Sequence, residues 1–245
     1  METELATPIL ALEEVVAGYG GFTVLNGANL GAARGVITTI IGPNGAGKST
    51  VFKTVFGLLP ARAGRVLFDG REVTNFSPRR LLELGVSYVP QGRNIFPELS
   101  VRHNLELGAT SMAGRVDVAA RIESVMNRFP MLRERAGAQA STLSGGQQKL
   151  LEIARGLLLE PKLMLIDEPS IGLSPLLVRD TFEILQQLRA RGVSILMVEQ
   201  NAKRALEISD YGVVLELGRA RMQGAARELL ADPRVGQLFL GGATL

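Results

Sequence analysis

Short apolar runs bounded by glycine recur along the chain and predict the strands of a sheet. The clearest is "GVITTII", residues 35–41, a β-branched run typical of a central parallel strand. "ILALEEVVAGYG" (9–20) and "FTVL" (22–25) precede it, and "VSYVP" (86–90) follows. Three further strands are predicted nearer the C-terminus, by "KLMLID", "VSILMVE" and "YGVVLEL".

Helical patterns separate these strands. Residues 48–59 predict one helix, and residues 92–160 carry helical patterns without a convincing strand. Within that stretch, "QQKLLEIARGLLLE" places its apolar residues at helical spacing. Ser174 before Pro175 is typical of a helix start and predicts a helix to about Ala190.

The simplest architecture is a single α/β domain. We expect a core formed by residues 1–91 and 161–245, with a mostly parallel sheet, and an α-helical insert at about 92–160. A small antiparallel strand layer at the start completes it. A chain of 245 residues that is 46% hydrophobic is long enough to bury such a core.

Composition narrows the compartment and the partners. The chain has no cysteine, which excludes disulfides and thiolate metal sites. Its acidic start "METELATP" lacks a signal-peptide pattern, and no apolar run approaches the ~20 residues that span a bilayer. We therefore expect a cytoplasmic protein. Net charge is only +3 with scattered basic residues, which predicts no nucleic-acid partner.

A glycine-rich segment between a predicted strand and a predicted helix carries the first chemistry. "GPNGAGKST" (42–50) contains G-x-x-x-x-G-K-[ST], whose backbone N–H groups wrap an anion at a helix N-terminus. A glycine-rich turn with a solvated lysine is the alternative, but the strand and helix make it remote. The candidate nucleotide-binding residues here are Gly42, Asn44, Gly45, Gly47, Lys48, Ser49 and Thr50.

Two carboxylates end the apolar run "LMLIDE" (163–168). At the carboxyl edge of a parallel sheet such a pair faces the ligand crevice. Asp167 is placed to hold Mg²⁺ together with Ser49, and Glu168 to accept a proton from a water that attacks the γ-phosphate. Strands often end in surface carboxylates, so the preceding phosphate loop gives this pair its weight.

A second possible anion site lies in "LSGGQQ" (143–148). Ser144, Gly145, Gly146 and Gln147 open a predicted helix, whose N-terminus attracts anions. A helix cap followed by a flexible glycine pair is the ordinary alternative. One nucleotide is already held by the first loop, so a second phosphate-binding segment calls for another explanation.

In this order, the phosphate loop, "LSGGQQ" and "LIDEPS" resemble an ABC-type ATPase, the nucleotide-binding subunit of ABC transporters. The resemblance runs from about Ile9 to Leu240 and implies a P-loop NTPase fold that binds ATP and Mg²⁺. It also implies that the signature loop closes over ATP held by an opposing cassette. This chain has one copy of each part, so it would pair head-to-tail with a sister ATPase or with itself.

The resemblance assigns further positions. Tyr19 in "AGYG" matches the aromatic residue that stacks on adenine, although it would otherwise be an ordinary strand-end tyrosine. Gln91 in "VPQG" matches the glutamine that reaches Mg²⁺ and the attacking water. "SIGLSP" (170–175) matches the loop that touches the partner cassette. Ile95, Phe96 and Leu99, in "RNIFPELS", lie where the family docks a permease helix, with Phe96 favoured for the interface. Packing inside the helical insert is the alternative for these three residues.

One position departs from the family pattern. The strand "SILMV" is followed by Glu199, Gln200 and Asn201, and Gln200 stands where the family normally supplies a histidine to the γ-phosphate. The only histidine, His103, lies in the predicted helical insert. The Gln200 amide can donate a hydrogen bond, but it cannot take up a proton or become charged. Glu168 therefore remains the expected base. Capping of the next helix is the alternative role for Gln200.

The glutamine at position 200 and two longer stretches favour one branch of the family. The glutamine, with "YVPQGRNIFPELSVRHNLELGA" and "DEPSIGLSP", resembles the smaller ATPase subunit of branched-chain (hydrophobic) amino-acid importers, a group that includes urea and short-amide systems. The resemblance implies two permease chains, an external solute-binding protein and a peripheral place on the inner face of the cell membrane. A soluble ABC-type ATPase in assembly or DNA maintenance is the alternative.

Overall fold

The computed structural model describes residues 8–110 and 117–240, so the acidic N-terminal residues 1–7 lie outside the described part. Its main sheet has the strand order β10-β9-β3-β8-β7-β6. All neighbouring strands are parallel except β10, which runs antiparallel to β9. The strands are β3 (Ile37–Ile41), β6 (Val86–Val89), β7 (Leu163–Asp167), β8 (Ser194–Val198), β9 (Tyr211–Glu216) and β10 (Arg219–Ala225).

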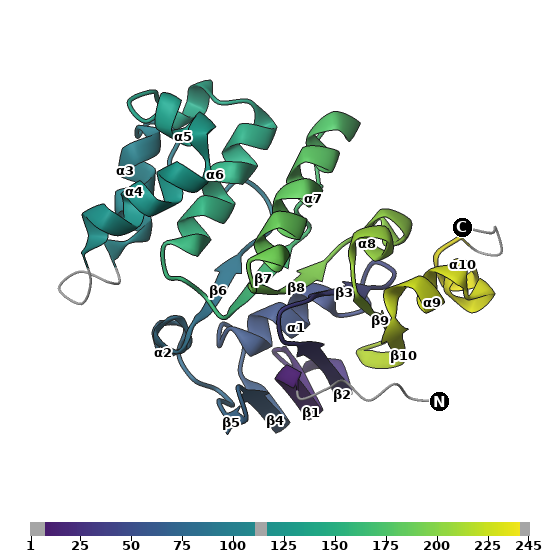
Figure 1. Cartoon of the computed structure of the whole chain (residues 1–245). Coiled ribbons are helices and arrows are strands. Elements are labelled where there is room, and N and C mark those ends of the chain that lie inside the picture. Colours follow the sequence, from purple (N-terminus) through teal and green to yellow (C-terminus); the bar gives the residue numbers. More distant parts are fainter. Residues whose placement is uncertain (1–7, 111–116, 241–245) are drawn as a thin grey trace.

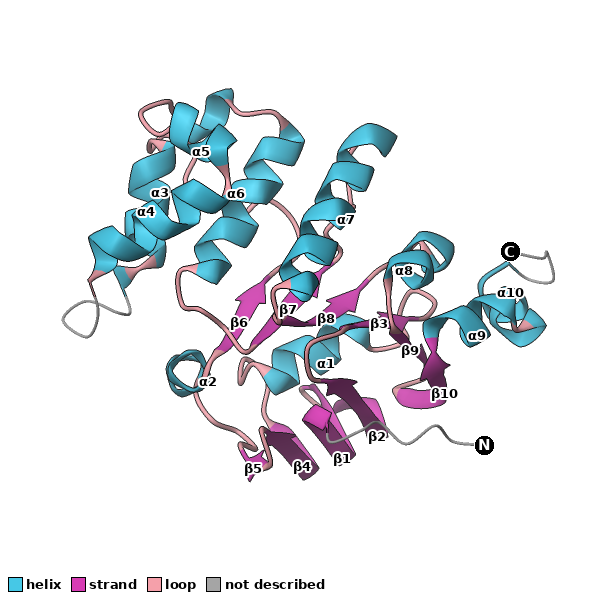
Figure 2. Ribbon diagram, viewed as in Figure 1, coloured by secondary structure: helices cyan, strands magenta, loops and turns pink. Residues whose placement is uncertain are grey.

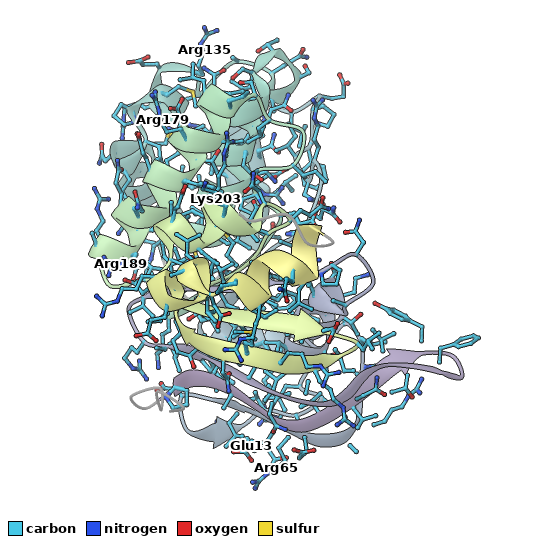
Figure 3. All side chains as sticks on the ribbon, turned by 90° about the vertical axis from the view of Figure 1, so that its right-hand side faces the viewer. Glu13, Arg65, Arg135, Arg179, Arg189 and Lys203 are labelled. Carbon is cyan, nitrogen blue, oxygen red and sulfur yellow. The ribbon has the colours of Figure 1, made fainter. Side chains whose placement is uncertain are left out.

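A second, antiparallel sheet has the order β2-β1-β4-β5. Helix α1 (Lys48–Val55) lies between the two sheets and contacts β1, β2 and β7 (Figure 1). On the outer side of this sheet Arg65 pairs with Glu13 at 2.6 Å (Figure 3). The strands are β1 (Pro8–Tyr19), β2 (Phe22–Ala33), β4 (Ala61–Phe68) and β5 (Arg71–Glu72).

Helices fill the chain between β6 and β7 and form a group to one side of the sheets (Figure 2). Side chains cap three of them: Ser100 accepts from the His103 N–H, Asp117 from the Ala120 N–H, and Ser144 from the Gln147 N–H. His103 itself is exposed. The group contains α3 (Val101–Gly108), α4 (Val118–Arg128), α5 (Pro130–Glu134), a 3₁₀ turn (Ala140–Thr142) and α6 (Gly145–Leu157).

The remaining helices flank the strands of the main sheet. None of the helices in the described ranges is long and apolar enough to cross a bilayer. They are α2 (Pro78–Leu84), α7 (Pro175–Ala190), α8 (Ala202–Ile208), α9 (Ala226–Ala231) and α10 (Pro233–Leu240).

The main sheet is buried on both faces because its strands alternate between two hydrophobic clusters. In β7, Met164 and Ile166 pack towards α6 and α7, whereas Leu163 and Leu165 pack towards α1 and the antiparallel sheet. β8 repeats this alternation. Each fully buried aliphatic side chain contributes about 1.5–3 kcal/mol. The rigid centre of the molecule is thus the sheet whose carboxyl edge carries the polar residues.

The predicted α/β class, antiparallel layer and central strands are confirmed, but some element bounds differ. α1 ends at Val55 rather than near Leu59, because the N–H groups of Leu58 and Leu59 turn back to the Lys53 carbonyl. β2 continues to Ala33, well past "FTVL". Strand β10 was not predicted, since "RARMQGA" has few apolar residues and lies at the sheet edge.

Candidate active site

The parallel strands bring four chain segments to one edge of the main sheet. β3, β6, β7 and β8 all run in the same direction, so the residues after their carboxyl ends face one side. The phosphate loop follows β3 and Gln91 follows β6. Asp167 ends β7 and Glu168 comes next, while Gln200 lies two residues after the end of β8. Sequence positions more than 150 residues apart therefore meet here.

The phosphate loop leads directly into α1, as predicted. Gly47 is the N-cap of α1 with a φ of 104°, a left-handed conformation that favours glycine. Lys48 is 6% exposed, and its Nζ donates to the Gly42 carbonyl at 2.7 Å and the Pro43 carbonyl at 3.1 Å. Its side chain therefore folds over the loop. Burial lowers the pKa of Lys48, and the carboxylates of Glu168 and Asp167 oppose that shift.

One carboxylate oxygen of Asp167 is buried and accepts no hydrogen bond. The residue is 2% exposed, and its Oδ1 has no hydrogen-bond partner. Its Oδ2 accepts from the Tyr88 hydroxyl at 3.3 Å. Burial raises the pKa of Asp167, as does Glu168, while Tyr88 and Ser49 hydrogen bonds and Lys53 lower it. The unsatisfied carboxylate oxygen of Asp167 and the hydroxyl of Ser49 are oxygen ligands of the kind that Mg²⁺ prefers.

Glu168 is held by both its backbone and its side chain. Its φ of 47° is unusual for a non-glycine residue, and its N–H donates to the Val198 carbonyl at 2.9 Å. One carboxylate oxygen, Oε2, accepts from the Gln91 amide at 2.7 Å and from the Gln200 amide at 2.8 Å. Two neutral donors thus orient this carboxylate through one oxygen. The Gln91 amide lies on Glu168, although the family resemblance assigns Gln91 to the metal.

The alternative role for Gln200 belongs to its neighbour. Asn201 is the N-cap of α8, and its side chain accepts from the Arg204 N–H at 3.1 Å. Gln200 is exposed at the rim of the site and turns its amide to Glu168. The three polar residues after β8 therefore do different things, because Glu199 is buried and contacts a third segment.

The signature residues open α6, as predicted. Ser144 and Gln147 form a capping box: the Ser144 Oγ accepts from the Gln147 N–H, and the Gln147 Oε1 accepts from the Ser144 N–H. The polar side chains of this helix start thus bond to each other, which leaves the helix N-terminus itself as the anion-attracting feature. A Cβ at Gly146 would lie 2.6 Å from Leu177 on α7, and one at Gly145 would lie 3.4 Å from Leu173.

Tyr19 lies at the end of β1 and is 45% exposed. The Lys53 ammonium lies 5.6 Å from the centre of its ring. Arg62 on β4 fixes the turn around it by donating to the carbonyls of Gly18 at 3.1 Å and Gly20 at 2.5 Å. A half-exposed ring on a fixed turn is suited to stacking against a base.

A buried ion pair ties the loop after Gln91 to α6. Lys149 and Glu152 pair at 2.5 Å, with side chains only 6% and 3% exposed. Lys149 also donates to the Gly92 carbonyl at 3.2 Å, and Glu152 accepts from the Asn94 N–H at 2.5 Å. The helix that starts with the signature residues is therefore joined to the loop that carries Gln91.

Beside this loop lies a groove of about 290 Å³. Its lining includes Phe56, Leu82, Tyr88, Gly108, Arg155 and Leu159. Phe96 lies next to it, 46% exposed, with the Arg155 guanidinium 5.2 Å from the centre of its ring. Ile95 and Leu99 are partly buried. An apolar groove with one cation at its wall is suited to receive an amphipathic segment.

A family model described as "ABC transporter" matches residues 25–171, well over half of the chain. The chain belongs to the ABC transporter family. It is an ATP-binding cassette and an ATPase, as the resemblance implied.

Relatives extend the match to nearly the whole cassette. The branched-chain amino acid transport ATP-binding protein BraG of Pseudomonas aeruginosa is 38% identical, over 96% of this chain and all of BraG. The lipopolysaccharide export ATP-binding protein LptB of Escherichia coli is 32% identical over 95% and 97%. A solved ABC transporter cassette in its ADP conformation has a TM-score of 0.86 at 30% identity, over 96% of this chain and all of that one.

Sequence reasoning missed several residues that shape the cassette's site. Tyr88 contacts Asp167, Arg62 fixes the Tyr19 turn, and Lys149 with Glu152 anchors the Gln91 loop. Each of these contacts links segments far apart in the sequence, so local patterns do not indicate the partners. The exception is Lys149 with Glu152: two charged residues within the apolar stripe of α6 indicate that each needs a buried partner.

Proposed function

We propose that this cassette hydrolyses ATP to power an importer of branched-chain (hydrophobic) amino acids or of a related small amide such as urea. The convergence of Gln91 and Gln200 on one oxygen of Glu168, at the edge that carries the phosphate loop, supports hydrolysis at this site. The solute class rests on relatives: BraG at 38% and LivF of Archaeoglobus fulgidus at 37% are described as branched-chain amino acid transport ATP-binding proteins.

The residues divide the reaction between them. The phosphate loop and α1 would hold the phosphates, with Lys48 exchanging its two carbonyl partners for phosphate oxygens. Tyr19 would stack on adenine. Glu168 would accept the proton of the attacking water through Oε1, because its Oε2 already accepts two amides. Gln200 would position that carboxylate and donate to the γ-phosphate.

Mg²⁺ would be held by Ser49 and Asp167, with Gln91 nearby. The unsatisfied Oδ1 of Asp167, beside Ser49, supports this assignment. Bound there, the ion would neutralise charge on the β- and γ-phosphates. One carboxylate and one hydroxyl are typical for Mg²⁺, which keeps waters and phosphate oxygens as its other ligands.

A complete site would need a partner. In the proposed assembly, Ser144, Gly145, Gly146 and Gln147 of one cassette face the ATP of a second, either a sister ATPase or another copy of this chain. The groove beside Phe96 would receive a segment of one of two permease subunits. These would hold the cassette on the inner face of the cell membrane, with a solute-binding protein outside.

Lys48→Ala tests hydrolysis at this loop. We expect steady-state ATP turnover to fall to background and nucleotide affinity to weaken, because the variant loses its one cation over the β- and γ-phosphates. Lys203→Ala, an exposed lysine on α8 (Figure 3), is the matched control and should hydrolyse ATP normally. Near-normal turnover by Lys48→Ala would contradict the assignment of the site.

The solute is tested by reconstituting the cassette in liposomes with two permease chains and a sister ATPase of an importer of this class. ATP-dependent uptake of labelled leucine, isoleucine or valine, lost in Lys48→Ala, is the expected result. Uptake of urea alone would select the short-amide branch. ATPase activity that responds to lipopolysaccharide instead would contradict the proposal and favour an LptB-like exporter.

A further inference from the structure

Glu199 is a buried carboxylate that the reaction described above does not use. It is 1% exposed and follows the last residue of β8. Burial raises its pKa, hydrogen bonds from Ser170 and Gln200 lower it, and nearby Glu168 raises it. A carboxylate in such a place is costly unless donors satisfy it. Its partners therefore indicate what it is for.

Three donors hold this carboxylate, and none is a cation. The Ser170 N–H donates to Oε1 at 2.9 Å, and the Ser170 hydroxyl donates to Oε2 at 2.8 Å. The Gln200 N–H donates to Oε2 at 3.1 Å. Both oxygens are occupied and the side chain is shielded from solvent, which excludes Glu199 as a base for a substrate water.

The donors join two stretches that have different jobs. Ser170 begins "SIGLSP", the loop proposed to contact the second cassette, in which Ile171 is 43% exposed. Gln200 donates its amide to Glu168 at 2.8 Å. A further bond, from the Glu168 N–H to the Val198 carbonyl, lies beside these contacts. Displacement of the loop through Ser170 would therefore shift Glu199 and the backbone of Gln200 with it.

We propose that Glu199 is a positioning residue that couples the 170–175 loop to Gln200, holding the Gln200 amide against Glu168 and passing displacement of this loop by the second cassette on to that amide. This inference rests on the proposed function, since it presupposes hydrolysis between two cassettes. It gives Glu199 a role through its neighbours rather than through ATP.

Two variants remove the link at its two ends. Ser170→Ala deletes the hydroxyl donor, and Glu199→Gln keeps the shape while removing the charge. In full-length protein with its sister cassette, each should lower kcat by roughly tenfold, the size of a lost hydrogen bond to a charged group. The KM for ATP and the binding of ATP to the isolated chain should change by less than about twofold.

Ser194→Ala is the matched control. Ser194 lies at the other end of β8, is as buried as Glu199, and its hydroxyl accepts from the Gly35 N–H at 2.9 Å. It should leave kcat unchanged.

A double-mutant cycle separates positioning from a merely structural role. If Glu199 acts through Gln200, Glu199→Gln combined with Gln200→Ala should be no slower than the slower single variant. Fold losses that multiply, parallel losses of ATP affinity, or wild-type kcat in both single variants would overturn the proposal. Because Lys48→Ala is measured beside them, its retained turnover would instead mark failure of the proposed function.

Discussion

The Glu168 carboxylate is oriented by two glutamine amides rather than by a histidine. Both amides meet Oε2, from the ends of β6 and β8 on either side of β7. These amides are neutral donors and do not themselves titrate. The backbone of Glu168 adopts a positive φ of 47°. Gln200 thus donates to Glu168 at the position where the family resemblance implies a histidine.

Gln200→Ala removes one of these amides. A hydrogen bond to a charged group contributes about 1.5–3 kcal/mol, so we expect turnover to fall by roughly one to two orders of magnitude. Steady-state hydrolysis with the sister cassette measures it. Asn201→Ala is the adjacent control: loss of the α8 cap should cost about 1 kcal/mol of stability without a comparable loss of turnover.

Gln200→His extends this prediction to pH. An imidazole with a pKa of about 6.5 should introduce a titration step in turnover near that pH. The wild type should show no such step, and turnover of Gln200→Ala equal to wild type would contradict the role given to this amide.

At the scale of elements, α6 links the signature residues to the Gln91 loop and to α7. The Lys149–Glu152 pair makes the first link, and the approach of Leu177 to Gly146 makes the second. Both links start from α6, in the helical group to one side of the sheets (Figure 1). Movement of this group would therefore reach Gln91 directly.

Glu152→Ala should lower the free energy of unfolding by about 3–5 kcal/mol, because it leaves the Lys149 charge buried and unpaired. Lys149→Met combined with Glu152→Met should recover most of that loss, yet turnover should stay reduced since the Gln91 loop is no longer tied to α6. Urea unfolding and ATPase rates measure the two effects. Glu13→Ala, which breaks the exposed pair with Arg65, is the control and should cost less than about 1 kcal/mol. Normal turnover in the double variant would contradict the link.

Gly146→Ala tests the contact between α6 and α7 apart from any contact with ATP. The added Cβ would lie 2.6 Å from the Leu177 Cδ2, so we expect a loss of about 1–2 kcal/mol in unfolding free energy. Leu177→Ala in the same background should relieve the clash and make the pair non-additive. Gly137→Ala, where a Cβ meets open space, should be neutral. Additive losses would exclude this packing as the reason for glycine.

The sequence predicted those parts of the fold and site that short patterns encode. Apolar runs bounded by glycine gave the central strands, and parallel strands explain why the phosphate loop, Asp167 and Gln200 meet. Contacts between residues far apart in the sequence could not be predicted from short patterns. Ser170 and Glu199 are 29 residues apart, and Tyr88 and Asp167 are 79 apart. Edge strand β10 was missed because its burial is weak and its pattern irregular.

At the scale of the whole molecule, the phosphate loop belongs to the sheet core, whereas the signature residues belong to the helical group. The loop follows β3 at the carboxyl edge of the main sheet, and the signature residues open α6 in the helical group. Since the proposal places the signature of a second cassette over each ATP, hydrolysis should depend on protein concentration and on the sister chain.

Glu168→Gln tests the central claim most directly. The variant keeps the phosphate loop and the proposed Mg²⁺ ligands Asp167 and Ser49. It lacks only the carboxylate that accepts the proton. With ATP, Mg²⁺ and the sister cassette, we expect ATP affinity within about twofold of wild type and turnover lowered by at least about a hundredfold. Sedimentation should show ATP-bound dimers accumulating. Turnover near the wild-type rate, or monomers alone under these conditions, would contradict the account.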